Sequence, residues 1–375
     1  MRSTSRRTDE SPLTMTIAVI IPVFNSSELL TDTLLAVHSG TRVPDELIVI
    51  DDGSSDESAR TAERFGARVV RMPQNVGPAA CRNYAALLSR SEILMFLDCD
   101  TCVHTDTIER MERRLRADAS LAAVIGSYDD APRHPATCSQ YRNLAHCYVH
   151  RSANRAALTF WSGCGAVRRA WFLEVDGFDE RYRKPSIEDI ELGYRMSDRG
   201  ARILLDPEIC VTHTKRWTVR SSITTDIFNR GVPWMVLLLE RRRIPDDLNL
   251  RRRHRIAAVL TGVALVCLAA CVRSPLWLVP CFLLATLALC MDAGLLKFIY
   301  RKRGSRSLVV AASMTLVQNL CKLVATGGGL LVFASRSLPS HRLRRGERRS
   351  QIVDCRQAWE EESVRRSKLP STMYG

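Results

Sequence analysis

Short runs of β-branched residues alternate with amphipathic helical patterns in the first part of the chain. Apolar residues at every second position indicate strands, and apolar residues three and four positions apart indicate helices. Units of strand, helix and strand fold into a mostly parallel sheet with helices on both faces, so the predicted fold class is α/β. The expected strands are Ile17–Val23, Leu47–Asp51, Ala67–Arg71 and Ile93–Asp98, and the expected helices are Glu28–His38, Glu57–Phe65 and Pro78–Ser89.

Two of these expected strands end in acidic residues. Asp51–Asp52 follows one apolar run, and Asp98–Cys99–Asp100 follows another. In sheets of this class, ligands bind beyond the carboxyl ends of the strands. We therefore expect both acidic groups to face one crevice, where the chemistry takes place.

Asp98 and Asp100 are two carboxylates at positions i and i+2 after an apolar strand. A hard divalent cation such as Mg²⁺ or Mn²⁺ takes oxygen ligands and often combines one or two carboxylates with substrate phosphates. One interpretation is therefore a metal site for a diphosphate whose departure requires charge neutralisation. The other is a solvated turn, because Asp is common in turns.

Three further segments each have a functional and a structural interpretation. The segment Asp51–Asp56 fits either a contact to a nucleoside base or ribose, or an ordinary strand-to-helix turn. Glu188–Asp189 opens a helical pattern, where a carboxylate acts as a general base for an acceptor hydroxyl or stabilises the helix N-terminus. His213, which precedes Lys215–Arg216–Trp217, is either a metal or phosphate contact or a structural histidine.

Long apolar runs dominate the chain from Ile256 to Ala334. The run Ile256–Val272 is just long enough to span a bilayer, and Leu276–Leu296 follows it after a short turn, so we expect a transmembrane hairpin. The third run, Leu308–Ala334, contains polar residues. A single span there would place the basic C-terminal tail opposite the other basic loops, and a re-entrant or interfacial helix pair is the alternative.

The net charge of +14 is concentrated in four basic clusters that flank the apolar runs. Anionic lipid head groups attract such clusters, by roughly 1 kcal/mol for each basic residue. No nucleic-acid-binding motif accompanies them, so we expect a membrane and no nucleic acid as partner. The N-terminus does not resemble a secretory signal, and the 13 cysteines show no regular spacing. A cytoplasmic head with reduced thiols is expected.

These patterns divide the chain into five parts. We expect a disordered tail at residues 1–15, a catalytic domain at 16–220, a basic amphipathic connector at 221–255, a membrane region at 256–335 and a basic polar tail at 336–375. An amphipathic, basic segment such as the connector lies at a bilayer surface. The predicted localisation is the inner membrane of a cell, multi-pass, with the catalytic domain in the cytoplasm.

The order of the motifs resembles that of family 2 glycosyltransferases with the GT-A fold. The resemblance covers roughly Thr16 to Trp217, and a series of motifs in the expected order is more specific than any single one. The matching segments are Val19–Asn25, Asp51–Asp56, Asn75–Asn83, Asp98–Asp100, Gly163–Gly165, Gly177–Glu180 and Glu188–Asp189.

This resemblance implies an inverting transfer from a nucleotide-sugar donor, a UDP- or GDP-sugar, with Asp189 as the catalytic base. It also implies a divalent cation, Mg²⁺ or Mn²⁺, which together with Arg82 stabilises the leaving nucleoside diphosphate. The implied metal ligands are Asp98 and Asp100, and His213 is a further candidate. The implied donor-binding residues are Pro22, Phe24, Asn25, Asp51, Asp52, Arg82 and Asp98, and those on the acceptor side are Glu188, Arg216 and Trp217.

Two departures from the family pattern concern the first loop and the acceptor. The family often has Glu directly after Asn in the first loop, whereas Ser26 and Ser27 precede Glu28 here. Processive members carry a Q-x-x-R-W motif, and this chain has His213 in place of the Gln. This substitution weakens the interpretation as a polysaccharide synthase.

We therefore expect transfer to a lipid or lipid-linked acceptor. The alternatives are a processive polysaccharide synthase and a catalytically silent membrane protein that binds a nucleotide sugar. The combination of Asp98, Asp100 and Asp189 argues against a silent protein.

Two other pairs of polar residues carry weaker signals. His146 and His150 share a helix face at a spacing used by zinc sites, but no third ligand is evident, so a helix surface or the acceptor side is favoured. Asp292 and Lys322 lie in apolar surroundings, where ionisable groups are either functional or located at an interfacial end.

Overall fold

The computed structural model describes residues 14–337. The chain divides into two units, one up to Gly329 and one from Leu330 onward. All contacts described below lie within the first unit.

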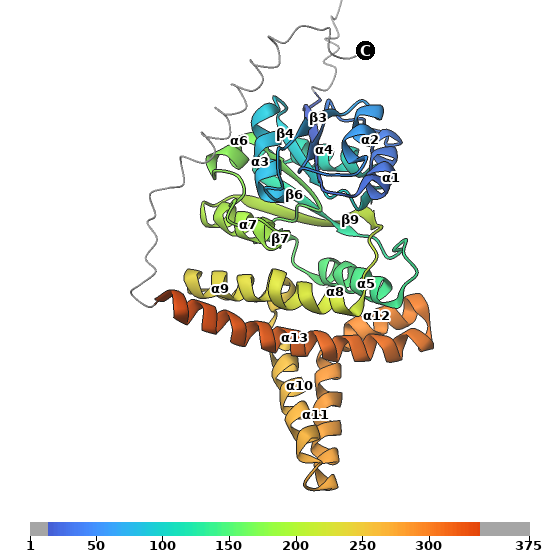
Figure 1. Cartoon of the computed structure of the whole chain (residues 1–375), viewed down its shortest axis with the longest axis vertical. Coiled ribbons are helices and arrows are strands. Elements are labelled where there is room, and N and C mark those ends of the chain that lie inside the picture. The colour runs from blue at the N-terminus through green and yellow to red at the C-terminus, as the bar shows by residue number, and fades with distance from the viewer. Residues whose placement is uncertain (1–13, 338–375) are drawn as a thin grey trace, which may run out of the picture. The chain divides into compact units, whose positions relative to one another are not determined.

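One mixed sheet organises the described residues (Figure 1). Its strands are β1 (Ile17–Val23), β2 (Glu46–Asp51), β3 (Arg68–Arg71), β4 (Ile93–Leu97), β5 (Thr101–Val103), β6 (Leu121–Tyr128), β7 (Ala156–Ala157), β8 (Cys164–Arg168) and β9 (Arg202–His213). The strand order is β3-β2-β1-β4-β8-β6-β9-β5, and β7 pairs with β9. The pairs among β1 to β4 and the pair β6–β9 are parallel, whereas β8, β5 and β7 pair in antiparallel fashion.

Helices cover both faces of this sheet. They are α1 (Ser27–His38), α2 (Ser58–Arg64), α3 (Pro78–Leu88), α4 (Thr107–Ala117), α5 (Thr137–Ser152), α6 (Arg169–Glu174) and α7 (Glu188–Asp198). In β1, Ala18 and Ile20 belong to one buried apolar cluster, and Ile17, Val19 and Ile21 belong to another. This alternation follows from the two-residue period of a strand, and both faces are apolar because both are covered. The predicted α/β class is confirmed.

The sheet differs from the expected one in its second half. The apolar pattern of the sequence also predicts a strand at Arg202–Leu205, and this segment is only the start of β9, which continues to His213. The pairing with β6 is irregular, because Ile125 faces Leu205 whereas Ser127 faces Cys210. Pro207 lies in the extra segment of β9, and proline cannot donate a ladder hydrogen bond. This irregularity separates the predicted part of β9 from the part that reaches the acidic site.

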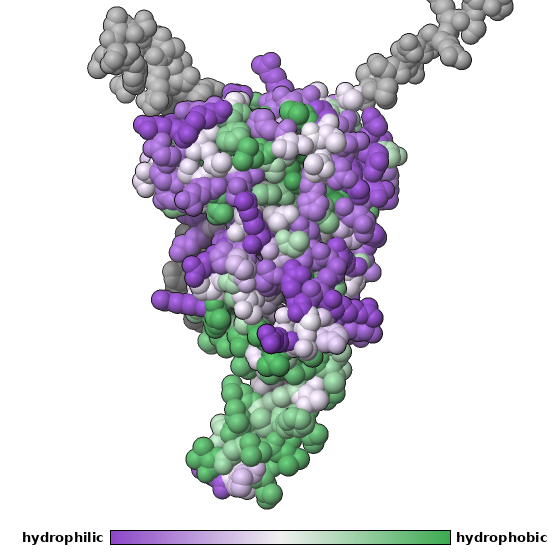
Figure 2. All heavy atoms as spheres, turned by 90° about the vertical axis from the view of Figure 1, so that its right-hand side faces the viewer, coloured by the Kyte–Doolittle hydropathy of each residue, from purple (hydrophilic) through white to green (hydrophobic). Residues whose placement is uncertain are grey.

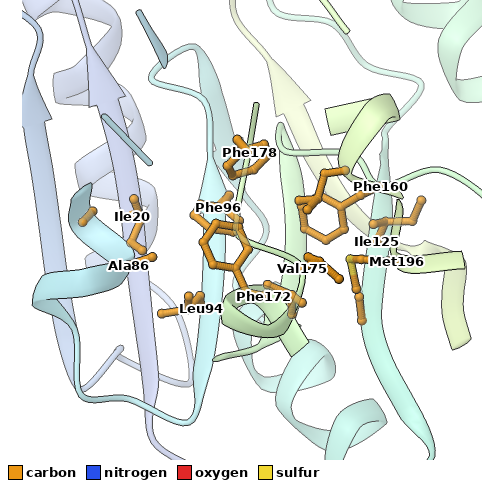
Figure 3. Close-up of a cluster of buried hydrophobic side chains, with 14 of the residues drawn as sticks. Ile20, Ala86, Leu94, Phe96, Ile125, Phe160, Phe172, Val175, Phe178 and Met196 are labelled. Carbon is orange, nitrogen blue, oxygen red and sulfur yellow. The ribbon is translucent and has the colours of Figure 1, made fainter. Parts of the chain in front are cut away.

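A group of aromatic rings holds the centre of the sheet together (Figure 3). The ring of Phe96 in β4 lies 5.1 Å from that of Phe178, 5.3 Å from that of Phe172 and 6.1 Å from that of Phe160, measured between centroids. Such pairs contribute about 0.5–1.5 kcal/mol each beyond the area they bury. The cluster therefore fixes β4 against the segments that precede β8 and α7.

Helices and turns make up the remaining described chain. They are α8 (Val219–Thr224), a π-helix (Thr225–Gly231), α9 (Val232–Arg241), a 3₁₀ turn (Leu248–Leu250), α10 (Arg252–Ala270), a second 3₁₀ turn (Pro275–Trp277), α11 (Leu278–Met291), α12 (Ala293–Arg303) and α13 (Ser305–Ser337).

Helices α10 and α11 form a hairpin whose surface is apolar (Figures 1 and 2). Val266, Val272, Leu276 and Phe282 are each at least 69% exposed. By length and composition alone, Arg252–Ala270 and Ser305–Arg336 are able to cross a membrane, and the bent pair Pro275–Met291 and Ala293–Arg303 would be a third span.

The expected run Leu276–Leu296 is not one straight helix. The segments Pro275–Met291 and Ala293–Arg303 meet at an angle of 74°. Asp292 lies at this break, where its carboxylate is 2.8 Å from Nδ1 of buried His254. A buried carboxylate requires such a partner, so Asp292 ends the helix and ties it to α10.

The third apolar run forms one continuous helix, α13, and the alternative of a re-entrant helix pair is wrong for the described residues. Its first half packs on α5, where the Tyr141 hydroxyl bonds to Thr315 and Gln318 at 3.0 Å each. Further along, a Cβ atom built on Gly329 would lie 2.5 Å from Cβ of Met235 in α9. The glycine run thus permits close contact between α13 and the connector.

Candidate active site

The loops after β1 and β2 are joined by short polar side chains. Oδ1 of Asn25 accepts a hydrogen bond from the backbone N–H of Ser55 at 2.8 Å, and the Asn25 N–H donates to Ser54 Oγ at 2.9 Å. The Asp51 carboxylate accepts from the Ser54 N–H at 3.0 Å. Phe24, which is 47% exposed, lies beside this junction in the sequence. The structure therefore brings together Asn25 and Asp51, two of the predicted donor-binding residues.

Asp52 supports the loop that precedes α3. Its two carboxylate oxygens accept hydrogen bonds from the N–H groups of Val76 at 2.7 Å and Gly77 at 3.0 Å. Gly77 has a φ of +96°, and a Cβ atom there would lie 2.2 Å from the carbonyl oxygen of Arg183. Burial raises the pKa of Asp52 despite these hydrogen bonds. The side chain thus holds the loop before α3, and a direct donor contact remains a prediction.

Arg82 is the centre of a buried charge network. Its guanidinium donates to Asp98 at 2.6 Å and to Glu188 at 3.0 Å, and the residue is 3% exposed. Burial alone would lower the Arg82 pKa, but the carboxylates of Asp98 and Glu188 raise it above its ordinary value. The other Glu188 oxygen accepts from the Ser186 N–H at 2.8 Å. Glu188, predicted on the acceptor side, therefore supports Arg82.

Asp100 and His213 meet because β5 pairs with β9, which places Thr101 opposite His213. His213 Nε2 lies 3.8 Å from Asp100 Oδ2, and Lys215 Nζ lies 3.6 Å from the same oxygen. The buried imidazole of His213 also stacks on Tyr128, with ring centroids 4.5 Å apart. Burial raises the pKa of Asp100, but His213 and Lys215 outweigh it and lower the value to about 2.

These residues fit a cation that is shared with a substrate. No group of three His, Cys, Asp or Glu side chains within residues 14–337 is arranged to hold a metal by itself. Asp100 is nevertheless held in its charged form beside His213, and Asp98 is 36% exposed in its side chain. A hard cation is commonly bound by one or two carboxylates and completed by substrate phosphates. The donor set thus fits an open site.

Asp189 is the second residue of α7. Its Oδ2 accepts a hydrogen bond from the Ser162 N–H at 3.1 Å, and its Oδ1 accepts from the Ile190 N–H at 2.8 Å. Burial and the neighbouring Glu188 carboxylate raise the Asp189 pKa to about 6. A carboxylate with a pKa in this range is suited to general base catalysis near neutral pH.

Asp189 also lines a cavity of about 310 Å³. The other walls come from α5, the π-helix, α9, α10, α12 and α13. Asp98 and Asp100 do not line this cavity. The acidic residues therefore occupy two adjoining regions that are linked by Arg82, whose pKa is raised by Asp98, Glu188 and Asp189 together.

The remaining predicted residues have mainly packing contacts. The Arg142 guanidinium lies 4.2 Å from the ring centroid of Trp217, and the Trp217 N–H donates to Ser139 Oγ at 2.7 Å. Arg216 is exposed. An acceptor contact by Arg216 or Trp217 stays a prediction.

His146 and His150 are members of a ring cluster in the cavity wall. Their ring centroids are 4.1 Å apart, and His146 also contacts Tyr128 and Trp161. His150 Nδ1 pairs with the Gly126 carbonyl at 3.0 Å. Both histidines line the cavity, and a role on the acceptor side stays a prediction.

Sequence reasoning missed Arg142, Trp161, Asp226 and Arg230, which also line the cavity. These residues match no motif and come from elements far apart in the chain. Only the packing of α5, the connector and α13 brings them together.

Comparison with known proteins identifies similar sequences and structures. Residues 18–175 match the family model described as Glycosyl transferase family 2. Dolichyl-phosphate beta-glucosyltransferase ALG5C of Trichomonas vaginalis is 23% identical over 286 residues, which cover 72% of this chain and 75% of the relative. O-antigen chain rhamnosyltransferase RfbN of Salmonella typhimurium is 27% identical over 237 residues, which cover 59% of this chain and 74% of the relative.

Among solved structures, mannosyltransferase PcManGT from Pyrobaculum calidifontis, in complex with GDP-Man and Mn²⁺, is similar. It shares 18% identity and has a TM-score of 0.46, with 86% of this chain and 87% of that chain covered. The family 2 resemblance and the GT-A-like fold are confirmed.

Proposed function

We propose that this chain, a nucleotide-sugar glycosyltransferase with a family 2 domain at residues 18–175, transfers a sugar to a lipid or lipid-linked acceptor and inverts the anomeric centre. One observation carries the proposal. Asp189, whose pKa is raised to about 6, adjoins the Arg82 network on one side and lines a cavity that reaches α10 and α13 on the other.

The donor side is formed by the strand ends. The loops that contain Phe24, Asn25 and Asp51 would hold the nucleoside. Asp98, Asp100 and His213 would hold a divalent cation, which when bound neutralises charge on the diphosphate leaving group. The two positive side chains nearest to these acids, Arg82 and Lys215, would bind the same diphosphate.

The proposed reaction is a single displacement. An acceptor hydroxyl transfers its proton to Asp189 while its oxygen forms a bond to the anomeric carbon. The bond between that carbon and the diphosphate oxygen breaks, and the electron pair leaves with the nucleoside diphosphate. Attack from the side opposite to the leaving group inverts the configuration. The hydrogen bonds from the Ser162 and Ile190 N–H groups orient the Asp189 carboxylate for this step.

Several features support a membrane-bound acceptor. The α10–α11 hairpin exposes large apolar side chains, and basic clusters flank it. The cavity beside Asp189 is built partly from helices of this apolar region. The Trichomonas vaginalis relative is named as acting on dolichyl phosphate, a lipid phosphate. We infer an inner-membrane protein with its head in the cytoplasm.

The test is transfer of labelled sugar from a panel of UDP- and GDP-sugars into organic-extractable product by membranes that contain the full chain. Asp189→Asn should lower the rate of transfer to a hydroxyl acceptor by at least about hundredfold, because general base catalysis contributes about 10²–10⁴-fold. Asp98→Ala should also abolish transfer. Asp198→Asn, at the far end of α7, should retain activity because it only loses a surface ion pair with Arg241.

Full incorporation by both Asp189→Asn and Asp98→Ala would contradict the assigned roles. A long polymer as the product would instead identify a polysaccharide synthase. Nucleotide binding without any transfer or donor hydrolysis would identify a silent binding protein.

A further inference from the structure

The wall of the cavity beside Asp189 contains three acidic residues, Asp189, Asp226 and Asp292, and three Arg or Lys residues, Arg142, Arg230 and Lys322. Two of the acidic residues lie close to a basic side chain of the same wall, although the imidazole of His254 is charged only when protonated. Arg142 Nη1 lies 2.8 Å from Asp226, and His254 lies 2.8 Å from Asp292. The carboxylate of Asp189 is bound by backbone N–H groups.

Two cations in the same wall have no carboxylate partner. Within residues 14–337, neither Arg230 nor Lys322 has a carboxylate oxygen within 4 Å. Among the described residues, the Arg230 guanidinium makes no hydrogen bond, and the Lys322 ammonium donates only to Oδ1 of Asn319 at 3.0 Å. An unpaired basic group beside a cavity attracts an anionic ligand, and ionisable groups in apolar surroundings are often functional.

The backbone holds these two cations on neighbouring elements. Arg230 belongs to the last turn of the π-helix Thr225–Gly231, a conformation that is rare and often found at functional sites. A Cβ atom on the next residue, Gly231, would lie 2.4 Å from Cβ of Ala325 in α13. Lys322 is one turn earlier on that same helix. The close approach at Gly231 brings the two elements into contact, and both basic residues line the cavity.

Arg230 is the cation nearer to the reacting end. Its positive charge lowers the pKa of Asp189 and of His146, so it lies within electrostatic reach of both groups. A guanidinium binds a phosphate through two parallel hydrogen bonds, whereas an ammonium such as Lys322 acts as a point charge. Another part of the wall is apolar and includes Trp234, Met235, Leu238 and Leu295.

We propose that this cavity is the acceptor site and binds a phosphate or diphosphate group attached to a lipid, with Arg230 and Lys322 as its anion-binding residues. The inference rests on the proposed function and specifies its substrate class. An anion with an apolar body matches two cations that have no carboxylate within 4 Å and an apolar part of the wall that lies beside helices α10 and α13. The donor diphosphate belongs elsewhere, because Asp98 and Asp100 are not part of this cavity.

Two kinds of lipid acceptor, called carriers below, contain such a phosphate or diphosphate group. The lipid phosphate is itself the sugar acceptor, or it links the lipid to a saccharide whose hydroxyl faces Asp189. A phosphate monoester is largely ionised at neutral pH and needs no base, whereas a hydroxyl does. Asp189→Asn therefore retains transfer to the first carrier and loses transfer to the second, which distinguishes them.

The experiment uses the full chain in vesicles, with labelled donor and three acceptors: a polyprenyl phosphate, a diphosphate-linked lipid saccharide and a neutral glycolipid. Arg230→Gln and Lys322→Gln should each raise KM for the phosphate-bearing acceptor about tenfold or more, because a hydrogen bond to a charged group contributes about that factor. KM for the donor should not change. Arg220→Gln and Lys297→Gln are matched controls, because both residues are exposed, lie on α8 and α12, and do not line the cavity.

Unchanged acceptor KM in Arg230→Gln and Lys322→Gln, with normal transfer by the unaltered chain, would overturn this inference and leave the proposed function intact. Equal use of the neutral glycolipid would overturn it as well. Failure of the unaltered chain to transfer to any acceptor would instead count against the proposed function. Retained donor KM in the variants shows that they are folded.

Discussion

Asp189 shows how local surroundings change the chemistry of a single residue. An exposed carboxylate is fully ionised and weakly basic at neutral pH, but burial disfavours its charged form. The adjacent Glu188 carboxylate acts in the same direction, and the Asp189 pKa rises to about 6. Asp100 shows the opposite result, because nearby His213 and Lys215 lower its pKa to about 2. Two carboxylates of one protein thus have pKa values that are shifted in opposite directions.

This difference predicts the pH dependence of transfer to a hydroxyl acceptor. Below its pKa Asp189 is protonated and cannot accept a proton, so kcat/KM should fall as pH decreases through about 6 and level off above it. Asp100 stays charged throughout this range and adds no second acid limb. Initial rates at constant metal concentration provide the measurement.

Arg230→Gln gives a second check on the acid limb of the pH profile, which is the fall of kcat/KM at low pH. The Arg230 charge lowers the pKa of Asp189, so its removal should shift the acid limb to higher pH. The exposed control Arg220→Gln should leave the limb in place. A profile that is flat between about pH 5 and 8, the range in which a base with a raised pKa titrates, would exclude Asp189 as the base.

Motif reading identified the residues that are proposed to react, but not their partners. Asp98, Asp100 and Asp189 follow from strand ends, spacing and the family resemblance. The contact between Arg82 and Glu188 joins residues 106 positions apart, and no local pattern contains it. Asp52 was expected to contact the donor, but its oxygens bind the loop at Val76 and Gly77. A motif identifies the residue type, and only the fold shows where its hydrogen bonds go.

At the level of helices, the Gly327–Gly329 run determines how closely α13 approaches α9. A Cβ atom on Gly329 would lie 2.5 Å from Cβ of Met235, whereas one on Gly327 would have no neighbour within 4 Å. Since both glycines lie in one helix, substitutions at the two positions can be compared directly.

We therefore predict opposite effects for two alanine substitutions. Gly329→Ala should destabilise the packing of α13 by about 1–3 kcal/mol, the usual effect of overpacking. Gly327→Ala should be neutral or stabilise the helix by up to about 1 kcal/mol, because alanine is the better helix former. Thermal unfolding in detergent measures both. Equal destabilisation by the two substitutions would contradict the proposed packing.

Some strands and helices were predicted from the sequence more accurately than others. β1 to β4 and the helices between them begin and end within one or two residues of the expected bounds, because their apolar periodicity is strong. β6 and β8 were not predicted as strands. Their small or uniformly buried residues, such as Ala122, Ala123 and Gly165, lack a clear two-residue alternation. The break at Asp292 depended on its pairing with His254.

At the level of the whole molecule, the exposed apolar hairpin requires a non-aqueous environment. Each large apolar side chain that leaves water contributes about 1.5–3 kcal/mol, and α10 and α11 expose many of them. The protein should therefore remain in the membrane pellet after washing with high salt and then with alkaline carbonate, and detergent should release it. Release by salt alone would mean that the basic clusters, and not the hairpin, hold the protein to the membrane.

The α/β class, the acidic strand ends and the apolar character of the last quarter of the described chain follow from the amino-acid sequence alone. These features depend on periodicity and composition, which neighbouring residues express locally. The tertiary structure decided that His213 reaches Asp100, that Arg82 joins Asp98 to Glu188, and that a cavity extends from Asp189 to Lys322. Those contacts arise from strand pairing and helix packing over long sequence distances, which no local pattern records.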